Sequence, residues 1–452
     1  MGKLFGTDGI RGVANEHPMT AEMALNVGRA VAQFFRKDHV RSKIVIGKDT
    51  RISGDMLESA MVAGICSMGG EPYLVGPIPT PGVAFLTSSM GADAGIVISA
   101  SHNPFYDNGI KVFKHDGHKL SDEKEAELEQ LILDDSMAAA CQSVRETGRV
   151  CPMADAGERY ADFLKKTIPA DCRFNGMKIF MDCSNGATYQ VAPKVFSDLG
   201  ADVTPLFVSP DGKNINEKCG SQHPEILGKK VVENKAQIGL AFDGDGDRLI
   251  AVDEQGNVIT GDQILVICAK VMKQKGLLKN DLVVSTVMSN IGFRLALKEM
   301  GIRHIMADVG DRYVMKEMLA SCGVIGGEDS GHMIFLEHHT TGDGILTALK
   351  LIEAMKAEDK PLSELGKIMS VFPQILMNVE VRTKPEIETV PEVMDAIRSV
   401  EASLGEKGRV LVRYSGTQPL CRVMVEGPTQ EETRGYCQEI VGVVEEVLGV
   451  KC

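Results

Sequence analysis

Short apolar runs alternate with amphipathic stretches along most of the chain. The run IVIG at residues 44–47 is followed by residues 53–68, where apolar side chains recur at three- and four-residue spacing. This spacing predicts a helix, and the Gly69-Gly70 pair behind it can end that helix in a left-handed conformation. Because a second apolar run, LVG at residues 74–76, comes next, the segment is typical of a strand–helix–strand unit.

The same order of strand and helix recurs twice. KIFMDC at residues 178–183 precedes a helical segment, ATYQVAPKVFSDLG, and LVVST at residues 282–286 precedes another helical stretch. Between these two units, Thr260 and Gln263 have the spacing of a capping box, which predicts a helix from there to about Lys275. The pattern therefore predicts α/β layers over most of the chain.

The end of the chain has a different pattern. VEVRT near Val379, VLVRY and RVMVE are typical of strands, and helical periodicity covers residues 391–404 and the final segment to Leu448. These elements predict a small open α+β module and not another parallel layer.

The length of 452 residues implies about three to four domains. Residues 134–156 are small, polar and charged without periodicity, which predicts a linker near residue 150, and further breaks are expected at residues 253–256, where EQG offers a turn, and at residues 357–361. We therefore expect three α/β domains and a C-terminal domain, at residues 1–150, 151–255, 256–370 and 371–452.

The composition argues against several kinds of partner. With 49 basic and 62 acidic residues the net charge is −13, which disfavours sequence-independent binding to nucleic acid. No apolar run approaches the roughly 18 to 20 residues of a membrane span, and the first residues lack the apolar core of a signal peptide. The 11 cysteines are scattered without a CxxC pair, which predicts reduced thiols in a cytoplasmic protein.

Three polar turns carry the residues best suited to chemistry. SASHNP at residues 99–104, DGDGDR at residues 243–248 and GGEDSGH at residues 326–332 each follow an apolar run. In α/β folds, ligands gather at the carboxyl ends of the strands, so these three turns are expected to face one cleft.

The second turn predicts a metal site. Asp243, Asp245 and Asp247 alternate with glycines, and carboxylates a few ångströms apart repel by roughly 4 kcal/mol per pair at an effective dielectric near 20. A bound cation removes this cost, and oxygen ligands favour Mg²⁺ or Mn²⁺ over zinc. An EF-hand is disfavoured because Arg248 stands where that loop needs glycine, and a solvated acidic turn is the alternative without a metal.

Ser101 is the candidate nucleophile. It lies in ISASHNP, where Pro104 prevents a helix and His102 and Asn103 add polar groups after an apolar run. A phosphoserine here would carry a charge of about −1.5 to −2, for which a metal on the aspartate turn would be a counterion. Ser99 is the rival nucleophile, and an ordinary loop serine is the alternative without chemistry.

The third turn is a candidate sugar site. Glu328, Ser330 and His332 offer a carboxylate, a hydroxyl and an imidazole, which could bind vicinal sugar hydroxyls and move a proton. A purely structural histidine is the alternative for His332.

A fourth segment, RYSGTQPLCR, is a candidate phosphate site. Ser415, Gly416 and Thr417 form a turn with hydroxyl and backbone donors, and Arg413 and Arg422 stand on either side of it. A chance surface loop is the alternative.

Two arginines near the start lie in glycine-containing segments. Arg11 belongs to FGTDGIRG and Arg51 to GKDTRISG, and either side chain could simply be solvated. The chain has no GxxxxGK[ST] motif, which disfavours a P-loop nucleotide site.

Together these motifs resemble the α-D-phosphohexomutase family. FGTDGIRG, GKDTRISG, ISASHNPFYDNGIK, DCSNGATY, NINEKCGS, FDGDGDR, VGDRY, GGEDSGH and RYSGTQPLCRVMVEG follow the family's order and cover the chain nearly end to end. DCSNGATY and NINEKCGS are most similar to the bacterial members that act on glucosamine phosphates. The resemblance implies three mixed α/β sandwich domains and a C-terminal α+β domain like the TATA-binding-protein fold, around a central cleft.

The resemblance also implies an activity. The chain would be an isomerase that interconverts glucosamine 6-phosphate and glucosamine 1-phosphate for cell-wall precursor synthesis. It would use one Mg²⁺ ion, a phosphoserine at Ser101, and a hexosamine 1,6-bisphosphate as intermediate and activator. Its partner would be a small-molecule sugar phosphate, with no nucleic acid or membrane, and a homodimer is compatible with the resemblance.

Family positions give each candidate residue an implied role. The metal ligands would be Ser101, Asp243, Asp245 and Asp247. The catalytic set would be Ser101, Arg11, His102, Lys111, Arg248 and His332, with Lys111 or His332 moving the proton. The substrate-binding set would be Glu328, Ser330, Arg413, Ser415, Gly416, Thr417 and Arg422.

Three residues depart from the pattern of the glucosamine-type members. Asp329 stands in place of the usual Gln, Tyr414 in place of Lys, and Gln418 in place of Glu. Phosphoglucomutase or phosphomannomutase activity is therefore an alternative within the same reaction class. A non-catalytic sugar-phosphate sensor and a metal-dependent phosphatase are alternatives of other classes.

Overall fold

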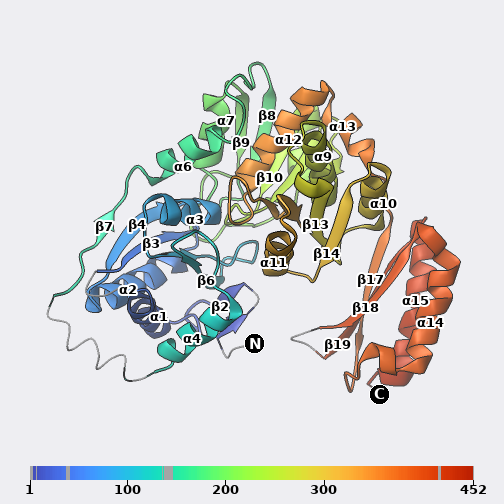
Figure 1. Ribbon diagram of the computed structural model, residues 1–452, viewed down its shortest axis with the longest axis horizontal. Helices are drawn as coiled ribbons and strands as arrows, with labels where there is room; N and C mark the ends of the chain where they lie inside the picture. The colour runs from blue at the N-terminus through green and yellow to red at the C-terminus, as the bar shows by residue number, and fades with distance from the viewer. Residues whose placement is uncertain are drawn as a thin grey trace. The chain divides into compact units, whose positions relative to one another are not determined.

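The computed structural model describes residues 4–6, 8–36, 41–134, 136, 146–415 and 419–450. The chain divides into two compact units, Met1–Val287 with Arg303–Lys367, and Met288–Ile302 with Ile368–Cys452. The first unit contains three mixed sheets, and the second contains one antiparallel sheet (Figure 1).

The first sheet has seven strands in the order β1-β2-β6-β5-β3-β4-β7. Ile44 and Ile46 of β3 pack with α1 and α2 on one face, where a hydrophobic cluster forms. Gly47 and Gly95 leave room for α3 on the other face, because a Cβ at Gly47 would lie 2.5 Å from Val83. The elements are β1 (Phe5–Gly6), β2 (Gly9–Val13), α1 (Ala21–Phe34), β3 (Lys43–Lys48), α2 (Ser53–Ser67), β4 (Glu71–Pro77), α3 (Thr80–Ser89), β5 (Ala94–Ile98), β6 (Asp107–Lys114), α4 (Asp122–Ile132) and β7 (Cys151–Pro152).

The predicted end of α2 is confirmed. Met68 caps the helix, and Gly69 behind it has a φ of +81°, the left-handed conformation that glycine adopts without strain. The apolar spacing of residues 53–68 and the glycine pair were sufficient to locate this helix.

The second sheet has the order β12-β11-β10-β8-β9, with β8, β9 and β10 parallel. The EQG turn joins β11 to β12 within this sheet, and Gly256 adopts a φ of +87° there. The elements are α6 (Ala156–Lys165), β8 (Lys178–Asp182), α7 (Val191–Asp198), β9 (Asp202–Leu206), α8 (Glu225–Glu233), β10 (Ile238–Phe242), β11 (Leu249–Asp253) and β12 (Val258–Ile259).

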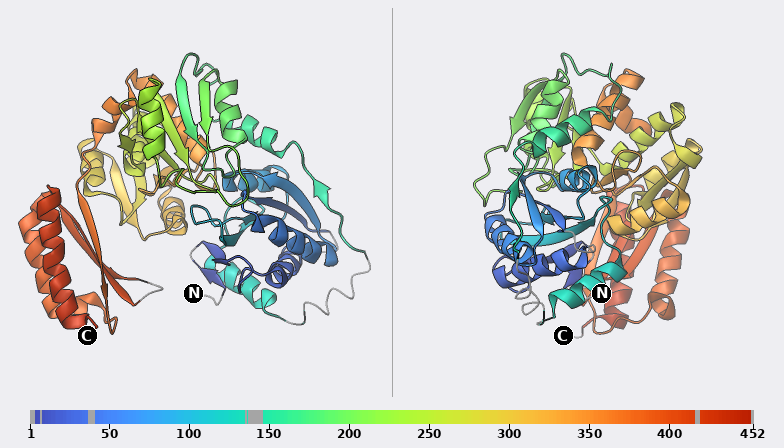
Figure 2. Two further views of the ribbon diagram at one scale, coloured as in Figure 1. Left: turned by 180° about the vertical axis from the view of Figure 1, so that it is seen from behind. Right: turned by 60° about the vertical axis from the view of Figure 1, so that its left-hand side comes forward.

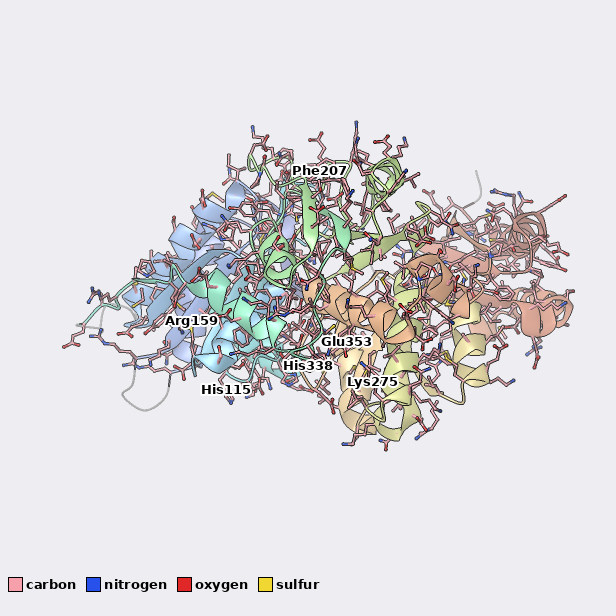
Figure 3. All side chains as sticks on the ribbon, turned by 90° about the horizontal axis from the view of Figure 1, so that it is seen from above. His115, Arg159, Phe207, Lys275, His338 and Glu353 are labelled. Carbon is pink, nitrogen blue, oxygen red and sulfur yellow. The ribbon has the colours of Figure 1, made fainter. Side chains whose placement is uncertain are left out.

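The third sheet has the order β14-β13-β15-β16. The predicted capping box of Thr260 and Gln263 opens α9, and Lys275 at the end of that helix pairs with Glu353 of α12 at 2.7 Å (Figure 3). The elements are α9 (Gly261–Gln274), the 3₁₀ turn η1 (Lys279–Asp281), β13 (Leu282–Thr286), β14 (Arg303–Ala307), α11 (Asp311–Ser321), β15 (Ile325–Gly327), β16 (Met333–Phe335), α12 (Gly344–Glu358), α13 (Leu362–Leu365) and η2 (Gly366–Ile368).

The second unit has a three-stranded antiparallel sheet in the order β17-β19-β18, with α14 and α15 on one face (Figure 2). Glu426 of β19 accepts the backbone N–H of Ile291 at 2.8 Å and pairs with Arg409 at 2.7 Å, so α10 is fastened to this sheet. The elements are α10 (Ile291–Glu299), β17 (Gln374–Glu380), η3 (Ile387–Thr389), α14 (Pro391–Leu404), η4 (Gly405–Lys407), β18 (Arg409–Tyr414), β19 (Leu420–Glu426) and α15 (Gln430–Leu448).

The predicted fold class is therefore confirmed: three mixed α/β layers and a C-terminal α+β module. Every cysteine in the part of the chain that the structure describes is a free thiol. Among the helices of the described residues, none is long and apolar enough to cross a lipid bilayer.

Candidate active site

The three polar turns lie within the first unit and contact one another. The Ser101 turn follows β5 of the first sheet, the aspartate turn joins β10 to β11 in the second, and the third turn joins β15 to β16. Ser101 Oγ donates to Asp243 Oδ2 at 2.6 Å, and the backbone of Arg248 pairs with that of His332. The structure thus brings together the three turns that the sequence singles out.

Ser101 is buried, and its backbone has an unusual conformation. It is 1% exposed, its φ is +51°, and its Oγ lies 3.3 Å from His102 Nδ1 as well as beside Asp243. Ser99, the rival nucleophile, donates its hydroxyl to Asp49 Oδ2 at 2.5 Å and accepts the N–H of Ser101 at 2.9 Å. This arrangement leaves Ser101, and not Ser99, facing the aspartate turn.

Asp243, Asp245 and Asp247 form a compact group of buried carboxylates. Their ligand oxygens lie within 4.8 Å of one another. Asp245 Oδ1 and Asp247 Oδ1 have no hydrogen-bond partner among the described residues. Burial and the charges of Asp247 and Asp245 raise the pKa of Asp243 well above its ordinary value. Because unpartnered carboxylate oxygens at this spacing fit a hard divalent cation, the trio could hold a metal ion.

A closed ring of six alternating charges shares Asp247 with this trio. Lys111 Nζ lies 3.6 Å from Asp247 Oδ2 and 3.1 Å from Asp8 Oδ2. Lys119 Nζ then lies 2.6 Å from Asp8 Oδ1 and 2.5 Å from Asp311 Oδ2. We call this set, completed by His332, the charge ring.

His332 closes the charge ring between two carboxylates. Its Nε2 lies 3.6 Å from Asp311 Oδ2, and its Nδ1 lies 3.5 Å from Asp247 Oδ2. Burial alone would lower the pKa of His332, but the charges of Asp247 and Asp311 raise it to about 9. Burial alone would also lower the pKa of Lys111. The neighbouring carboxylates, among them Asp245 at 3.0 Å from Lys111 Nζ, raise this pKa instead.

Two arginines lie beside the Ser101 turn, which contains His102. Arg248 Nη1 is 2.9 Å from His102 Nδ1, and because arginine only donates, Nδ1 is the acceptor and the neutral ring carries its proton on Nε2. Burial, Arg248 and Arg11 lower the pKa of His102 to about 4. Arg11 also donates to the carbonyl of Ala100 at 3.2 Å and pairs with Asp8. Both arginines therefore place positive charge near Ser101.

The candidate sugar residues are only partly engaged. Glu328 Oε1 accepts the N–H of Gly310 at 3.0 Å, and the N–H of Glu328 donates to the carbonyl of His332 at 2.9 Å. Ser330 Oγ is buried without a hydrogen-bond partner in the described part of the chain. An unpartnered buried hydroxyl is the feature expected of a ligand contact.

The sequence did not indicate roles for several residues that the structure brings to the site. Asp8, Lys119 and Asp311 complete the charge ring, and Asp49 and Arg51 lie fully buried beneath the Ser101 turn. Arg51 is therefore not the solvated side chain that the sequence allowed. The motifs FGTDGIRG, GKDTRISG and VGDRY contain four of these residues, but no local pattern shows which partners they meet.

The candidate phosphate site lies in the second unit. Arg413 and Arg422 are directly opposite each other on β18 and β19, and Arg422 Nε has no hydrogen-bond partner among the described residues. Burial and Arg422 lower the pKa of Arg413. Ser415 is buried, while Gly416 and Thr417 lie outside the described residues. Two adjacent guanidinium groups would be stabilised by an anion such as phosphate.

Four family models match the chain. Three are the phosphoglucomutase/phosphomannomutase alpha/beta/alpha domains I, II and III, at residues 2–139, 158–256 and 260–372, and one is the C-terminal domain of the same family, at residues 376–443.

Full-length relatives and solved structures agree with these matches. Phosphoglucosamine mutases of Syntrophus aciditrophicus and Syntrophobacter fumaroxidans are 63% and 61% identical, each over 99% of this chain and 100% of the relative. A phosphoglucomutase/phosphomannomutase family protein of Burkholderia thailandensis has the same fold, with a TM-score of 0.79, 24% identity, and coverage of 98% of this chain and 97% of that one. N-acetylphosphoglucosamine mutase of Aspergillus fumigatus, solved with GlcNAc-6P and magnesium, has a TM-score of 0.68 at 15% identity, covering 98% and 95%.

Proposed function

The chain belongs to the phosphoglucomutase/phosphomannomutase family and is an isomerase, and we propose that it interconverts glucosamine 6-phosphate and glucosamine 1-phosphate through a phosphoserine at Ser101. The observation that carries the proposal is the 2.6 Å contact of Ser101 Oγ with Asp243, beside two carboxylate oxygens that have no hydrogen-bond partner among the described residues. A phosphorylated hydroxyl at this position would need the charge compensation that such a site offers with a metal.

The proposed reaction transfers the phosphoryl group twice. O1 of glucosamine 6-phosphate forms a bond to phosphorus while the P–Oγ bond of phosphorylated Ser101 breaks. Lys111 or His332 gives a proton to the departing Oγ and takes the one released by O1. The resulting 1,6-bisphosphate turns over. Oγ of Ser101 then forms a bond to the phosphorus on C6 while the P–O6 bond breaks and O6 takes a proton, so glucosamine 1-phosphate is released.

The other residues position the phosphoryl group and neutralise its charge. Arg11 and Arg248 would stabilise its equatorial oxygens, and neutral His102 orients Arg248. When bound, Mg²⁺ held by the three aspartates and an oxygen of the phosphoserine would neutralise negative charge on the transferred group.

The residues proposed for substrate binding are those that the family pattern implies. Glu328 and Ser330 would bind the sugar hydroxyls. The distal phosphate would be bound by Arg413, Ser415, Gly416, Thr417 and Arg422. Because the bisphosphate must turn over, this phosphate site has to accept a phosphate on either carbon.

The remaining sequence expectations form part of the proposal. The chain would have four domains with boundaries near residues 150, 255 and 370, and would act in the cytoplasm, where it could form a homodimer. Its partner would be a small-molecule sugar phosphate, with a hexosamine 1,6-bisphosphate as activator. Relatives named phosphoglucosamine mutase that cover the whole chain support this substrate over glucose or mannose phosphates.

The test combines mass spectrometry with a coupled assay. Incubation with glucose 1,6-bisphosphate should add one phosphate to the wild type and to Ser99→Ala, but none to Ser101→Ala, whose turnover of glucosamine 6-phosphate should fall at least about 1000-fold. Parallel rates on glucosamine, glucose and mannose 6-phosphates identify the substrate. Full turnover by Ser101→Ala would refute the proposal, and steady release of inorganic phosphate would indicate a phosphatase instead.

A further inference from the structure

The nucleophile's backbone is held in a conformation that serine rarely adopts. Ser101 has a φ of +51°, within the left-handed region that side chains other than glycine seldom occupy. Such a conformation is disfavoured for residues with a side chain and persists only where surrounding contacts enforce it. Several of the contacts that hold it here lead to the segment Asp49–Arg51, which precedes α2.

Arg51 holds the carbonyl side of the Ser101 turn. Its side chain is fully buried, and its Nη2 donates to the carbonyls of Ser101 at 2.9 Å and Asn103 at 2.8 Å, while its Nη1 donates to that of Pro104. Nε donates to Asp49 Oδ2 at 2.8 Å. A single guanidinium thus binds three carbonyls of the four-residue turn.

Asp49 and Ser99 hold the amide side of the same residue. Asp49 Oδ2 accepts the hydroxyl of Ser99 at 2.5 Å, and Ser99 Oγ accepts the N–H of Ser101 at 2.9 Å. The carbonyl of Ser101 is therefore bound directly by Arg51, and the N–H of Ser101 is connected to Asp49 through the hydroxyl of Ser99. Both backbone groups thus depend on the ion pair of Asp49 with Arg51. Neither Asp49 nor Arg51 contacts Asp243, Asp245 or Asp247 in any hydrogen bond of the described residues.

A second support for the turn comes from the chain segment before α8. Asn216 Nδ2 donates to the carbonyls of Ser101 at 2.9 Å and Asn103 at 3.0 Å. If Arg51 is replaced, the carbonyls of Ser101 and Asn103 each keep Asn216 as a donor, and the carbonyl of Pro104 keeps the N–H of Asp107 at 3.2 Å. What is lost is the single cation that joins the three carbonyls to Asp49. Replacement of Arg51 should therefore leave the turn folded but make the position of Ser101 Oγ relative to the aspartate trio less well fixed.

We propose that Arg51 is a positioning residue for phosphoryl transfer, which fixes the left-handed backbone of Ser101 and so directs its Oγ toward the aspartate trio. This inference rests on the proposed function. The planar fork of arginine is required because a lysine ammonium cannot reach three carbonyls and a carboxylate in these directions. An error of about 1 Å in the position of a reacting group can lower a rate by about 100-fold.

The test compares Arg51→Lys with the wild type, each loaded with glucose 1,6-bisphosphate. We expect kcat with glucosamine 6-phosphate to fall about 100-fold while KM stays within about twofold, because Arg51 lies beneath the turn and not in the substrate site. Ser99→Ala, which removes only the amide-side link, should lower kcat by about tenfold. The ³¹P resonance of the phosphoserine should shift or broaden in both variants, since it reports the geometry at Oγ.

A matched control separates positioning from stability. Arg409 is a second largely buried arginine that binds a carboxylate, Glu426, and backbone carbonyls of Met288 and Ser289, all within the second unit. Arg409→Lys should lower the melting temperature to a similar extent but keep kcat within about threefold of the wild type.

The inference is overturned if folded Arg51→Lys keeps kcat within about threefold, if only its KM rises, or if Arg409→Lys loses kcat equally at equal stability. If Arg51→Lys does not fold, the kcat and ³¹P results of Ser99→Ala decide, and unchanged values there overturn it. A wild type without phosphate on Ser101 or without mutase turnover would instead refute the proposed function.

Discussion

Asp182 is a buried carboxylate whose oxygens accept two backbone N–H groups, from Ser184 and Gly220, each at 2.8 Å. Burial raises its pKa to about 6, even though both hydrogen bonds act in the opposite direction. The folded protein therefore keeps a proton here at pH values where the unfolded chain, with the ordinary pKa near 4, has lost it. This difference makes stability depend on pH.

The contribution of Asp182 to stability should be complete below about pH 4 and should be lost as pH rises through about 6. Two pKa units correspond to about 3 kcal/mol in the free energy of unfolding. Asp182→Asn lacks this titration, so the melting temperature of the wild type should decline relative to that of Asp182→Asn between pH 4 and 7. Other carboxylates titrate in both proteins and cancel. A difference that stays constant over this range would show that Asp182 is ionised throughout.

At the scale of residues, sequence predicts chemistry better than contacts. Ser101 and the three aspartates follow apolar runs and carry recognisable motifs, so they could be found without coordinates. Arg51 could not, because its acceptors are backbone carbonyls about 50 residues away, and a carbonyl has no residue identity that a sequence could show.

Elements were predictable where their signals are local. The capping box of α9 and the glycine behind α2 lie within a few residues of the ends that they determine. The order of the strands was not predictable, because it depends on pairing between distant segments. In the first sheet, for example, β6 lies antiparallel between β2 and β5, and β7 joins the far edge next to β4.

The first residue of α9 also supports the candidate sugar turn. A Cβ at Gly261 would lie 2.5 Å from the carbonyl oxygen of Asp329 and 2.6 Å from that of Glu328. Gly261→Ala must therefore displace this turn, and we expect kcat/KM for glucosamine 6-phosphate to fall at least tenfold, mainly through KM. Steady-state kinetics measure this effect.

Gly442 in α15 is a matched control for that substitution. Among the described residues, no atom outside its own helix lies within 4 Å of a Cβ built there. Gly442→Ala should keep full activity and raise stability by about 0.5–1 kcal/mol, because alanine favours the helix. Equal kinetics for the two variants would show that the turn tolerates displacement.

At the scale of the whole molecule, the charge ring joins segments of all three sheets of the first unit. Of the two lysines in the ring, Lys119 makes no hydrogen bond or ion pair with the aspartate trio or Ser101 among the described residues, but it binds Asp8 and Asp311, which in turn bind Lys111 and His332. Without it, two carboxylates lose a shared cation. Lys119→Met should lower kcat at least tenfold.

Lys114 provides the control for Lys119, since it lies five residues earlier and pairs with the partly exposed Asp116 at 3.0 Å. Lys114→Met should leave kcat unchanged, because exposed pairs contribute little. If both lysine variants behave alike in kinetics and melting temperature, the charge ring has no role in turnover.

The second unit offers a prediction that depends on the symmetry of the reaction. If Arg422 binds the distal phosphate, it contacts the phosphate on C6 in one orientation of the sugar and that on C1 in the other. Arg422→Gln should then raise KM for glucosamine 6-phosphate and for glucosamine 1-phosphate by similar factors, of about tenfold or more, with kcat changed by less than threefold.

The KM values, and not kcat/KM, make this test decisive. The overall equilibrium constant fixes the ratio of the kcat/KM values in the two directions. Any variant must therefore lower both kcat/KM values by the same factor. Arg398, whose side chain is 69% exposed on α14, gives a control in the same unit, and Arg398→Gln should change neither KM. If Arg422→Gln raised one KM and instead lowered kcat in the other direction, the phosphate site would discriminate between the two carbons, and a single site could not serve both orientations of the bisphosphate.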